Sequence, residues 1–144
     1  MKFYAVIDTN VVVSSILKRS SKPGLIIDLV NSNLIIPLLN EEIIEEYINV
    51  LTRNKFGFDD ITIQETINVL KKNAIYLKRE QSLEEFIDKD DIVFYEIVLS
   101  ARSTMDAYLV TGNMKHYPIR NYVVTPREMI EIIEKETGLH FEDA

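Results

Sequence analysis

Two kinds of hydrophobic pattern alternate along the chain. The first is a short, nearly continuous apolar run, which is typical of a strand buried on both faces of a sheet. Such runs occupy residues 3–8, 34–39, 74–78, 107–111 and 122–125, the last three more weakly than the first two. The pattern therefore predicts five short strands spread over most of the chain.

The second kind of pattern places apolar residues at helical spacing, and these segments lie between the strands. Pro23 and Pro126 suit the first turn of a helix, and Gly138 suits the end of one. Helices are expected over residues 11–18, 23–32, 41–53, 61–73, 91–102 and 126–137. Strands that alternate with helices predict an α/β protein, in which a parallel sheet is covered by helices on both faces.

In an open parallel sheet the ligand site lies beyond the carboxyl ends of the strands, so functional acids are expected there. Asp8 closes the first strand and is followed by Thr9 and Asn10. All three residue types commonly cap helices, and capping of the next helix by Thr9 or Asn10 is one reading. A cap needs only one such residue, so the run of three favours a functional role for Asp8.

The helix predicted over 41–53 carries four glutamates beside an apolar stripe. Helical spacing stacks Glu46 with Ile43 and Val50 at the margin of that stripe, whereas Glu45 falls on the wet face. Glu46 is therefore the better candidate for a half-buried carboxylate. The alternative is that all four glutamates are ordinary surface charges.

Three acids in four positions, DKDD at 88–91, come directly before a helix that is apolar on most sides. Asp90 or Asp91 could serve as its N-cap, and acids near a helix start also complement the helix dipole. Three acids exceed what a cap needs, so Asp91 is also a candidate site residue. Within the helix, Glu96 shares a polar stripe with later serines and is expected first to face solvent.

The strand over 107–111 ends at Thr111 and continues into Gly112, Asn113, Met114, Lys115 and His116. A threonine, a glycine and an amide at the end of a strand suit a loop whose backbone passes close to a ligand. Lys115 and His116 would then lie beside the pocket and could contact a phosphate. An ordinary loop histidine is the competing interpretation of His116.

Length and composition narrow the chemistry that these residues can perform. The 144 residues suit one domain spanning 1–144, and 47% of them are hydrophobic. The absence of cysteine excludes disulfides and zinc–thiolate sites, so carboxylates and two histidines remain as metal ligands. The carboxylates of Asp8, Glu46 and Asp91 would repel one another unless a cation lay among them, and these oxygen donors together with Asn113 suit Mg²⁺ or Mn²⁺.

Charge and the N-terminal sequence bear on partners and location. The net charge of −7 opposes nucleic-acid binding, since phosphate contacts depend on lysine and arginine, although a bound divalent cation would offset part of the repulsion. An acid follows the first few apolar residues too early for a signal peptide or a membrane span. The protein is therefore expected to be cytoplasmic, with no membrane contact.

Four motifs in this order resemble the PIN-domain family. They are DTN at 8–10, EEY at 45–47 with the VL-x-R-x-K-F tail at 50–56, D-x-x-D before FYE at 88–96, and LVTGN-x-K-H-Y-P at 109–118. The likeness extends from Ala5 to about Glu131 and is strongest to a branch described as toxin components of toxin–antitoxin systems.

The resemblance implies a three-layer α/β/α sandwich that acts as a metal-dependent ribonuclease. Carried over by position, it makes Asp8, Glu46 and Asp91 the catalytic acids around Mg²⁺ or Mn²⁺. It also implies an RNA substrate, a cognate antitoxin protein and a homodimer.

The same likeness implies supporting roles around the acids. Thr9 and Asn10 would orient Asp8 by hydrogen bonds, and Thr111 would line the pocket. Many family members carry an aspartate where this chain has Asn113, whose amide oxygen can bind a hard cation but adds no charge. Glu96 or Asp90 could compensate, and one tightly held ion is expected, with a second arriving with the substrate.

Two other functions compete with that of a ribonuclease. A PIN-like module that binds RNA or protein with weakened catalysis would follow from Asn113. A phosphotransferase with an aspartyl nucleophile needs a second aspartate two residues beyond Asp8, where the chain has Asn10, and is set aside.

Overall fold

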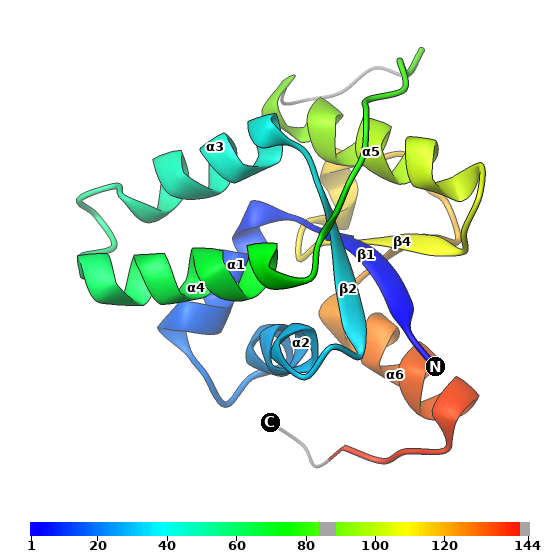
Figure 1. Cartoon of the computed structure of the whole chain (residues 1–144), viewed down its shortest axis with the longest axis horizontal. Coiled ribbons are helices and arrows are strands. Elements are labelled where there is room, and N and C mark those ends of the chain that lie inside the picture. The colour runs from blue at the N-terminus through cyan, green and yellow to red at the C-terminus, as the bar shows by residue number, and fades with distance from the viewer. Residues whose placement is uncertain (84–88, 142–144) are drawn as a thin grey trace.

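Five parallel strands form the centre of the protein (Figure 1). The structure is a computed structural model that describes residues 1–83 and 89–141. The strands lie in the order β3-β2-β1-β4-β5, and every neighbouring pair is parallel. Their bounds are Phe3–Ile7 for β1, Ile35–Leu39 for β2, Ile75–Tyr76 for β3, Ala107–Val110 for β4 and Val123–Val124 for β5.

Within residues 1–83 and 89–141, six α-helices connect and cover the strands. They are α1 (Thr9–Leu17), α2 (Lys22–Asn31), α3 (Glu41–Leu51), α4 (Asp60–Lys72), α5 (Ile92–Arg102) and α6 (Pro126–Thr137). Two short 3₁₀ turns, η1 (Lys89–Asp91) and η2 (Met114–His116), lie beside α5 and after β4. The predicted five strands and six helices are thus confirmed, and the two 3₁₀ turns are additions.

Most predicted boundaries differ from the structure by one or two residues, and two of these differences have a clear local cause. Helix α1 begins at Thr9, two residues earlier than expected, because Asp8 occupies the N-cap position with extended backbone angles. Strand β3 contains only Ile75 and Tyr76 of the expected 74–78, since it pairs with β2 over two positions at the edge of the sheet. Asp88, the first acid of the DKDD run, lies outside the described residues.

Helices cover both faces of the sheet. In Figure 1, α3 and α5 lie above the strands and α2 and α6 below them. Helix α5 packs on β1, β2 and β4, while α2 packs on β2 and contacts α1, α4 and α6. Because both faces are covered, β2 is buried at every position and β1 at all but Tyr4. The expected three-layer α/β/α sandwich is confirmed.

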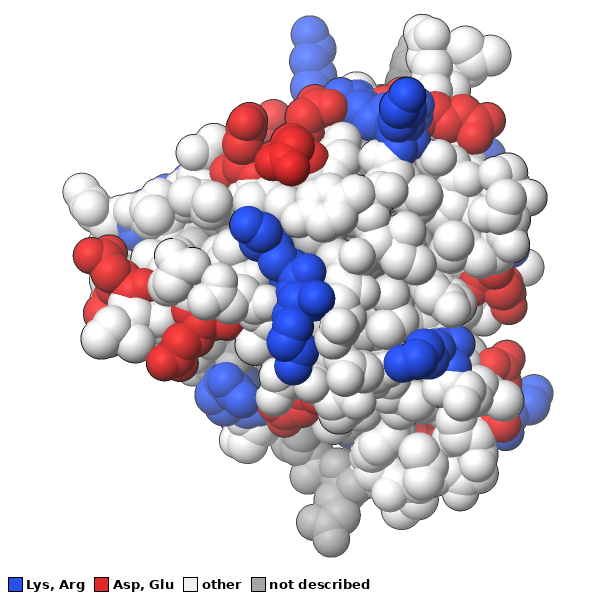
Figure 2. All heavy atoms as spheres, viewed as in Figure 1, with Lys and Arg blue, Asp and Glu red and all other residues white. Residues whose placement is uncertain are grey.

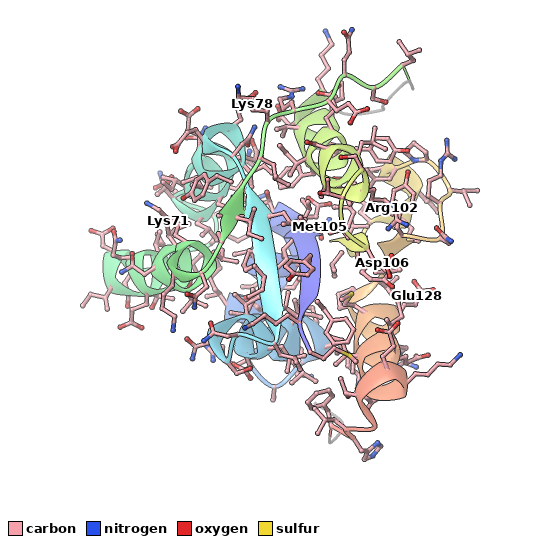
Figure 3. The ribbon with its side chains drawn as sticks, turned by 45° about the vertical axis from the view of Figure 1, so that its right-hand side comes forward. Lys71, Lys78, Arg102, Met105, Asp106 and Glu128 are labelled. Atoms are coloured by element: carbon pink, nitrogen blue, oxygen red, sulfur yellow. The ribbon has the colours of Figure 1, made fainter. Side chains whose placement is uncertain are left out.

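One arginine, Arg102, makes several contacts at the start of β4. Arg102, the last residue of α5, donates Nη1–H to the Ala107 carbonyl at 2.5 Å and lies 3.4 Å from the Asp106 carboxylate. Its guanidinium also lies 4.4 Å from the centroid of the Tyr122 ring. Figure 3 shows Arg102 and Asp106 at this connection between helix and strand. These contacts tie α5 to the sheet at the end opposite the acids.

The register of the strands brings their carboxyl ends together. Ile7 of β1 pairs with Val110 of β4, and the Asp8 amide donates to the Val110 carbonyl at 2.9 Å. The Thr111 amide in turn donates to the Val124 carbonyl at 2.9 Å. Asp8 and Thr111 are therefore neighbours where the carboxyl ends of β1 and β4 meet.

Within the described residues, no helix combines the length and the apolar character that crossing a bilayer requires.

Candidate active site

Three side-chain donors converge on one oxygen of Asp8. Its Oδ2 accepts hydrogen bonds from Thr111 Oγ1 at 2.7 Å, Tyr117 Oη at 3.1 Å and Asn10 Nδ2 at 3.2 Å. Asp8 is 5% exposed, so this carboxylate is held almost entirely by protein groups. All three donors bond to Oδ2, and none of them bonds to Oδ1.

The residues beside Asp8 fix the loop that follows β4. Asn10 also accepts a hydrogen bond from the Gly112 amide at 3.0 Å, so one amide side chain joins α1 to this loop. A Cβ at Gly112 would lie only 3.3 Å from Asn10 Oδ1, and glycine therefore allows the close approach. The Thr9 hydroxyl is buried and has no hydrogen-bond partner among the described residues, while the Thr9 backbone bonds to Asp8.

A second carboxylate, Asp91, lies across from Asp8. It ends η1 and occupies the N-cap position of α5, but its side chain makes no capping hydrogen bond. Instead, Asp91 Oδ2 lies 3.0 Å from His116 Nδ1, and Tyr117 Oη lies 3.5 Å from Asp91 Oδ1. Tyr117 therefore contacts both acids and links them.

His116 also connects Asp91 to Asn113. Nε2 of its ring lies 3.1 Å from Asn113 Nδ2. The His116 ring thus lies between the carboxylate of Asp91 and the side-chain amide of Asn113. In that arrangement the amide oxygen of Asn113 takes no part in the contact with His116.

Helix α3 brings Glu46 to the same region. Asn40 caps the helix by accepting a hydrogen bond from the Ile43 amide at 2.8 Å. Tyr47, the residue after Glu46, is 1% exposed and donates its hydroxyl to the carbonyl of Ile7. This bond joins α3 to the carboxyl end of β1. Glu46 is half-buried and Glu45 exposed, as the helical stripe predicted.

These residues surround a single cleft of about 320 Å³, which we call the carboxylate cleft. Its polar wall consists of Asp8, Thr9, Asn10, Ser14, Glu46, Asp90, Asp91, Asn113 and His116. Its apolar wall consists of Val13, Val50, Phe56 and Phe94. The cleft thus brings together four carboxylates from well-separated parts of the sequence.

Burial and hydrogen bonding act in opposite directions on Asp8. Burial raises its pKa above the usual 3.8, while hydrogen bonds from Thr111, Tyr117 and the Thr9 backbone, and the charge of His116, lower it. Because the net direction is upward, ionised Asp8 disfavours folding, and this cost vanishes as the pH falls below 3.8. Burial and the two carboxylates also raise the pKa of Tyr117, so its hydroxyl remains a donor.

The donors of the cleft suit a hard divalent cation by type. Carboxylate and amide oxygens dominate, and a cation would offset the unfavourable ionisation of Asp8. The unpartnered Thr9 hydroxyl in the wall is a further polar group that bound water or an ion could satisfy. In the arrangement seen, however, no three acidic or histidine side chains of the described residues come close enough to hold an ion together.

Some expected site residues lie outside the cleft. Thr111 is fully buried behind Asp8 and holds it rather than lining the pocket. Lys115 is exposed on η2 at the rim. Glu96 is 5% exposed, so the expectation that it faces solvent is wrong. Its carboxylate accepts from Arg79 Nε and from the Ser82 amide, both at 2.7 Å, in the segment that follows β3.

A second cavity, of about 370 Å³, lies between α1, α2 and α4. Its charged walls include Arg19 and Asp28, which form an exposed ion pair at 3.0 Å. Neither residue is buried, and the buried carboxylates all lie elsewhere among the described residues. The carboxylate cleft is therefore the better candidate for catalysis.

Tyr117 and Phe56 lie within the sequence motifs, but nothing in their spacing singled them out as site residues. Tyr117 is a single aromatic in an irregular loop, where no periodicity marks it as buried. Phe56 lies in the connection between α3 and α4 and enters the cleft wall from there. The hints of Tyr117 were the dense polar run around the strand end and the motif over 109–118 that contains it.

The chain is similar to a known protein family. A family model described as PIN domain matches residues 4–115, which include every wall residue of the cleft except His116. A search of curated proteins found no match to the chain.

Proposed function

Because the chain belongs to the PIN domain family, whose fold is of the nuclease type, we propose that it is a metal-dependent endoribonuclease. The observation that carries the proposal is the carboxylate cleft. Asp8 and Asp91 are both buried there and linked by Tyr117, and Glu46 joins them from a third element.

The proposed cofactor is Mg²⁺ or Mn²⁺. Asp8, Glu46 and Asp91 would hold it, with Asn113 supplying a neutral oxygen. A divalent cation bound there would lower the pKa of a water molecule and stabilise negative charge on the phosphate oxygens. Because Asn113 adds no charge, we propose one tightly held ion, with a second arriving with the substrate.

The reaction adds water across a phosphodiester bond of RNA. The water oxygen bonds to phosphorus while the bond from phosphorus to one ester oxygen breaks. A proton of the water passes to a carboxylate, and the leaving oxygen takes up a proton from solvent to become a hydroxyl group. Glu46 suits the role of proton-accepting carboxylate, since it is half-buried at the margin of the cleft. Tyr117, Thr111 and Asn10 hold Asp8 in place throughout.

Phosphate contacts must come from local basic groups, because the net charge is −7. Lysine and arginine are interspersed with acids on the face shown in Figure 2 and form no continuous basic surface there. Lys115 and His116 on η2 are the proposed contacts beside the cleft.

The motif order also resembles the toxin branch of the family. On that likeness we propose that the protein is the toxin of a toxin–antitoxin pair, with a neutralising antitoxin as a partner and a homodimer as its assembly.

Two observations favour a second candidate function. Asn113 replaces a family aspartate, and no three acidic or histidine side chains of the described residues converge on a point. Both features suit a PIN-like module that binds RNA or protein with weakened catalysis. Binding without turnover would distinguish this candidate.

The test is cleavage of varied RNAs by the purified protein with Mn²⁺ or Mg²⁺, beside EDTA and an Asp8→Asn variant. We expect metal-dependent cutting that EDTA and Asp8→Asn each abolish. Glu46→Gln should also reduce cutting strongly, whereas the matched Glu45→Gln change on the exposed neighbour should leave it unchanged. Uncut RNA with the wild type, together with absent Mn²⁺ binding by calorimetry, would favour the binding module.

A further inference from the structure

Two phenylalanine rings are stacked in the connection between α3 and α4. The centroids of Phe56 and Phe58 lie 5.3 Å apart, and the planes differ by only 6°. Gly57 between them has a φ of +63°, a conformation that side chains rarely adopt, and this turn allows both rings to face each other. The Phe56 amide donates to the Arg53 carbonyl at 3.1 Å and closes the turn.

Phe56 belongs to the wall of the carboxylate cleft, so the stack lies beside the acids. Phe58 supports the Phe56 ring from one side. The Nζ of Lys55 lies over the Phe56 ring, 5.1 Å from its centroid, and Lys55 is exposed. A half-buried aromatic ring of the cleft wall is thus covered in part by a solvated lysine.

We propose that Phe56 is a stacking platform for a base of single-stranded RNA next to the bond that is cut. The base would replace the Lys55 ammonium on the ring, and the lysine would then contact a phosphate. An exposed cation–π contact is weak, whereas base–aromatic stacking is stronger and accepts every base. This inference rests on the proposed function and adds to it a residue that binds substrate.

The charge of the protein supports an apolar contact of this kind. A net charge of −7 denies the protein the general attraction to phosphate that basic RNA-binding surfaces provide. Stacking does not depend on that attraction. Bases inside a duplex have no free face, so the platform requires an unpaired strand.

The experiment measures binding of a short single-stranded RNA in which fluorescent 2-aminopurine replaces one base at each position in turn. Binding is measured in the full-length Asp8→Asn protein with Mg²⁺, which prevents cleavage. We expect quenching at one position. Phe56→Leu should remove the quenching and weaken binding about 5- to 100-fold, the range that base–aromatic stacking gives. Phe56→Tyr, which keeps an aromatic face, should retain both the quenching and the binding affinity.

Phe141→Leu is the matched control, since it makes the same change in a half-buried ring near the C-terminus. It should bind like the parent protein. Equal binding and quenching by Phe56→Leu and its parent, or quenching at no position, would overturn the inference. If circular dichroism shows that Phe56→Leu is unfolded, the decision passes to Phe56→Tyr. Loss of quenching in that variant would overturn the inference.

Cleavage by proteins with an intact Asp8 separates the two proposals. Metal-dependent cutting that Phe56→Leu slows and Phe141→Leu leaves at the wild-type rate supports both. Cutting that is unaffected by Phe56→Leu overturns the platform and leaves the nuclease proposal intact. RNA binding with quenching but no cutting supports the platform and overturns the nuclease.

Discussion

The chemistry of the cleft depends on how Asp8 is held. Burial favours the neutral acid, and three donors on Oδ2 favour the carboxylate. Tyr117 is central to this balance because its hydroxyl also reaches Asp91 at 3.5 Å. One phenol therefore affects both the ionisation of Asp8 and the placement of two acids from different elements.

Replacing Tyr117 with phenylalanine should impair the cleft without removing a proposed ligand. The Tyr117 hydrogen bond lowers the pKa of Asp8, so its loss should raise that pKa and move the acid limb of the cleavage profile to higher pH. Loss of an orienting partner typically costs about 10- to 100-fold in metal affinity or activity. Mn²⁺ titration calorimetry and a pH–rate profile measure the two effects.

A control for this change is Tyr122→Phe. Tyr122→Phe also removes a hydroxyl contact, 3.2 Å from Tyr95 Oη, but that contact involves neither Asp8 nor Asp91. The Tyr122→Phe change should alter neither the Mn²⁺ affinity nor the acid limb of the pH–rate profile. Equal effects of the two variants would mean that Tyr117 has no special role at Asp8.

The rule that functional acids follow strand ends was enough to place Asp8 next to β1, and helical spacing placed Glu46 at the buried margin of α3. The same logic failed for Glu96. Its stripe of polar neighbours on α5 predicted solvent, but the segment after β3 covers it and supplies Arg79 as a partner. A contact across 17 positions through an irregular segment leaves no periodic trace in the sequence.

At the scale of elements, Arg79 connects the two helices that bring acids to the cleft. Its Nη1 lies 2.7 Å from Glu42 on α3, and its Nη2 lies 2.6 Å from Glu96 on α5. Glu42 lies one turn before Glu46 on the same helix, and Glu96 follows Asp91 by little more than a turn. The arginine thus ties α3 to α5 close to the acids that each helix positions.

Replacing Arg79 with methionine should destabilise the protein. The side chain of Glu96 is 7% exposed and would become a buried, unpaired charge, which typically costs about 3 to 5 kcal/mol. Arg79 itself is 35% exposed, so we expect a loss near the lower end, about 3 kcal/mol, in the free energy of unfolding. Urea denaturation followed by circular dichroism measures it.

Two variants test whether the buried charge is the cause. Adding Glu96→Gln to Arg79→Met should restore part of the stability. The new side chain is neutral, and its oxygen still accepts a hydrogen bond from the backbone N–H of Ser82. Arg19→Met removes an exposed partner of Asp28 and should cost less than about 1 kcal/mol. An Arg79→Met loss no larger than the Arg19→Met loss would contradict this role of Arg79.

The element order was predictable because buried strands and amphipathic helices carry different periods. Exact ends were not, since they depend on tertiary contacts. Helix α1 starts at Thr9 because Asp8 closes β1 and turns directly into the helix. Strand β3 is short because only Leu38 and Leu39 of β2 pair with it.

At the scale of the whole molecule, acidity sets how RNA can approach. The net charge of −7 and the isoelectric point near 4.9 produce a field that repels a polyanion. Local basic groups at the rim and a stacked base would have to overcome that field. Such repulsion is long-ranged, so acids far from the cleft should also slow the encounter.

Changing acids on α6 tests this expectation. Glu131 and Glu136 are exposed and contribute nothing to the cleft wall. Glu131→Gln/Glu136→Gln and Glu131→Lys/Glu136→Lys make the net charge of −7 progressively less negative. At low salt, kcat/KM for RNA cleavage should rise in the same order, by about 3-fold or more for the lysine pair.

The salt dependence identifies the origin of any increase. Screening confines charge effects to about 8 Å at physiological ionic strength, so the three proteins should converge as salt is added. Thermal denaturation serves as the control for intact folding. Equal kcat/KM values at low salt would mean that the overall field does not limit encounter and that contacts at the cleft alone set the rate. A difference that persists at high salt would instead point to a local structural effect of α6 on its neighbours.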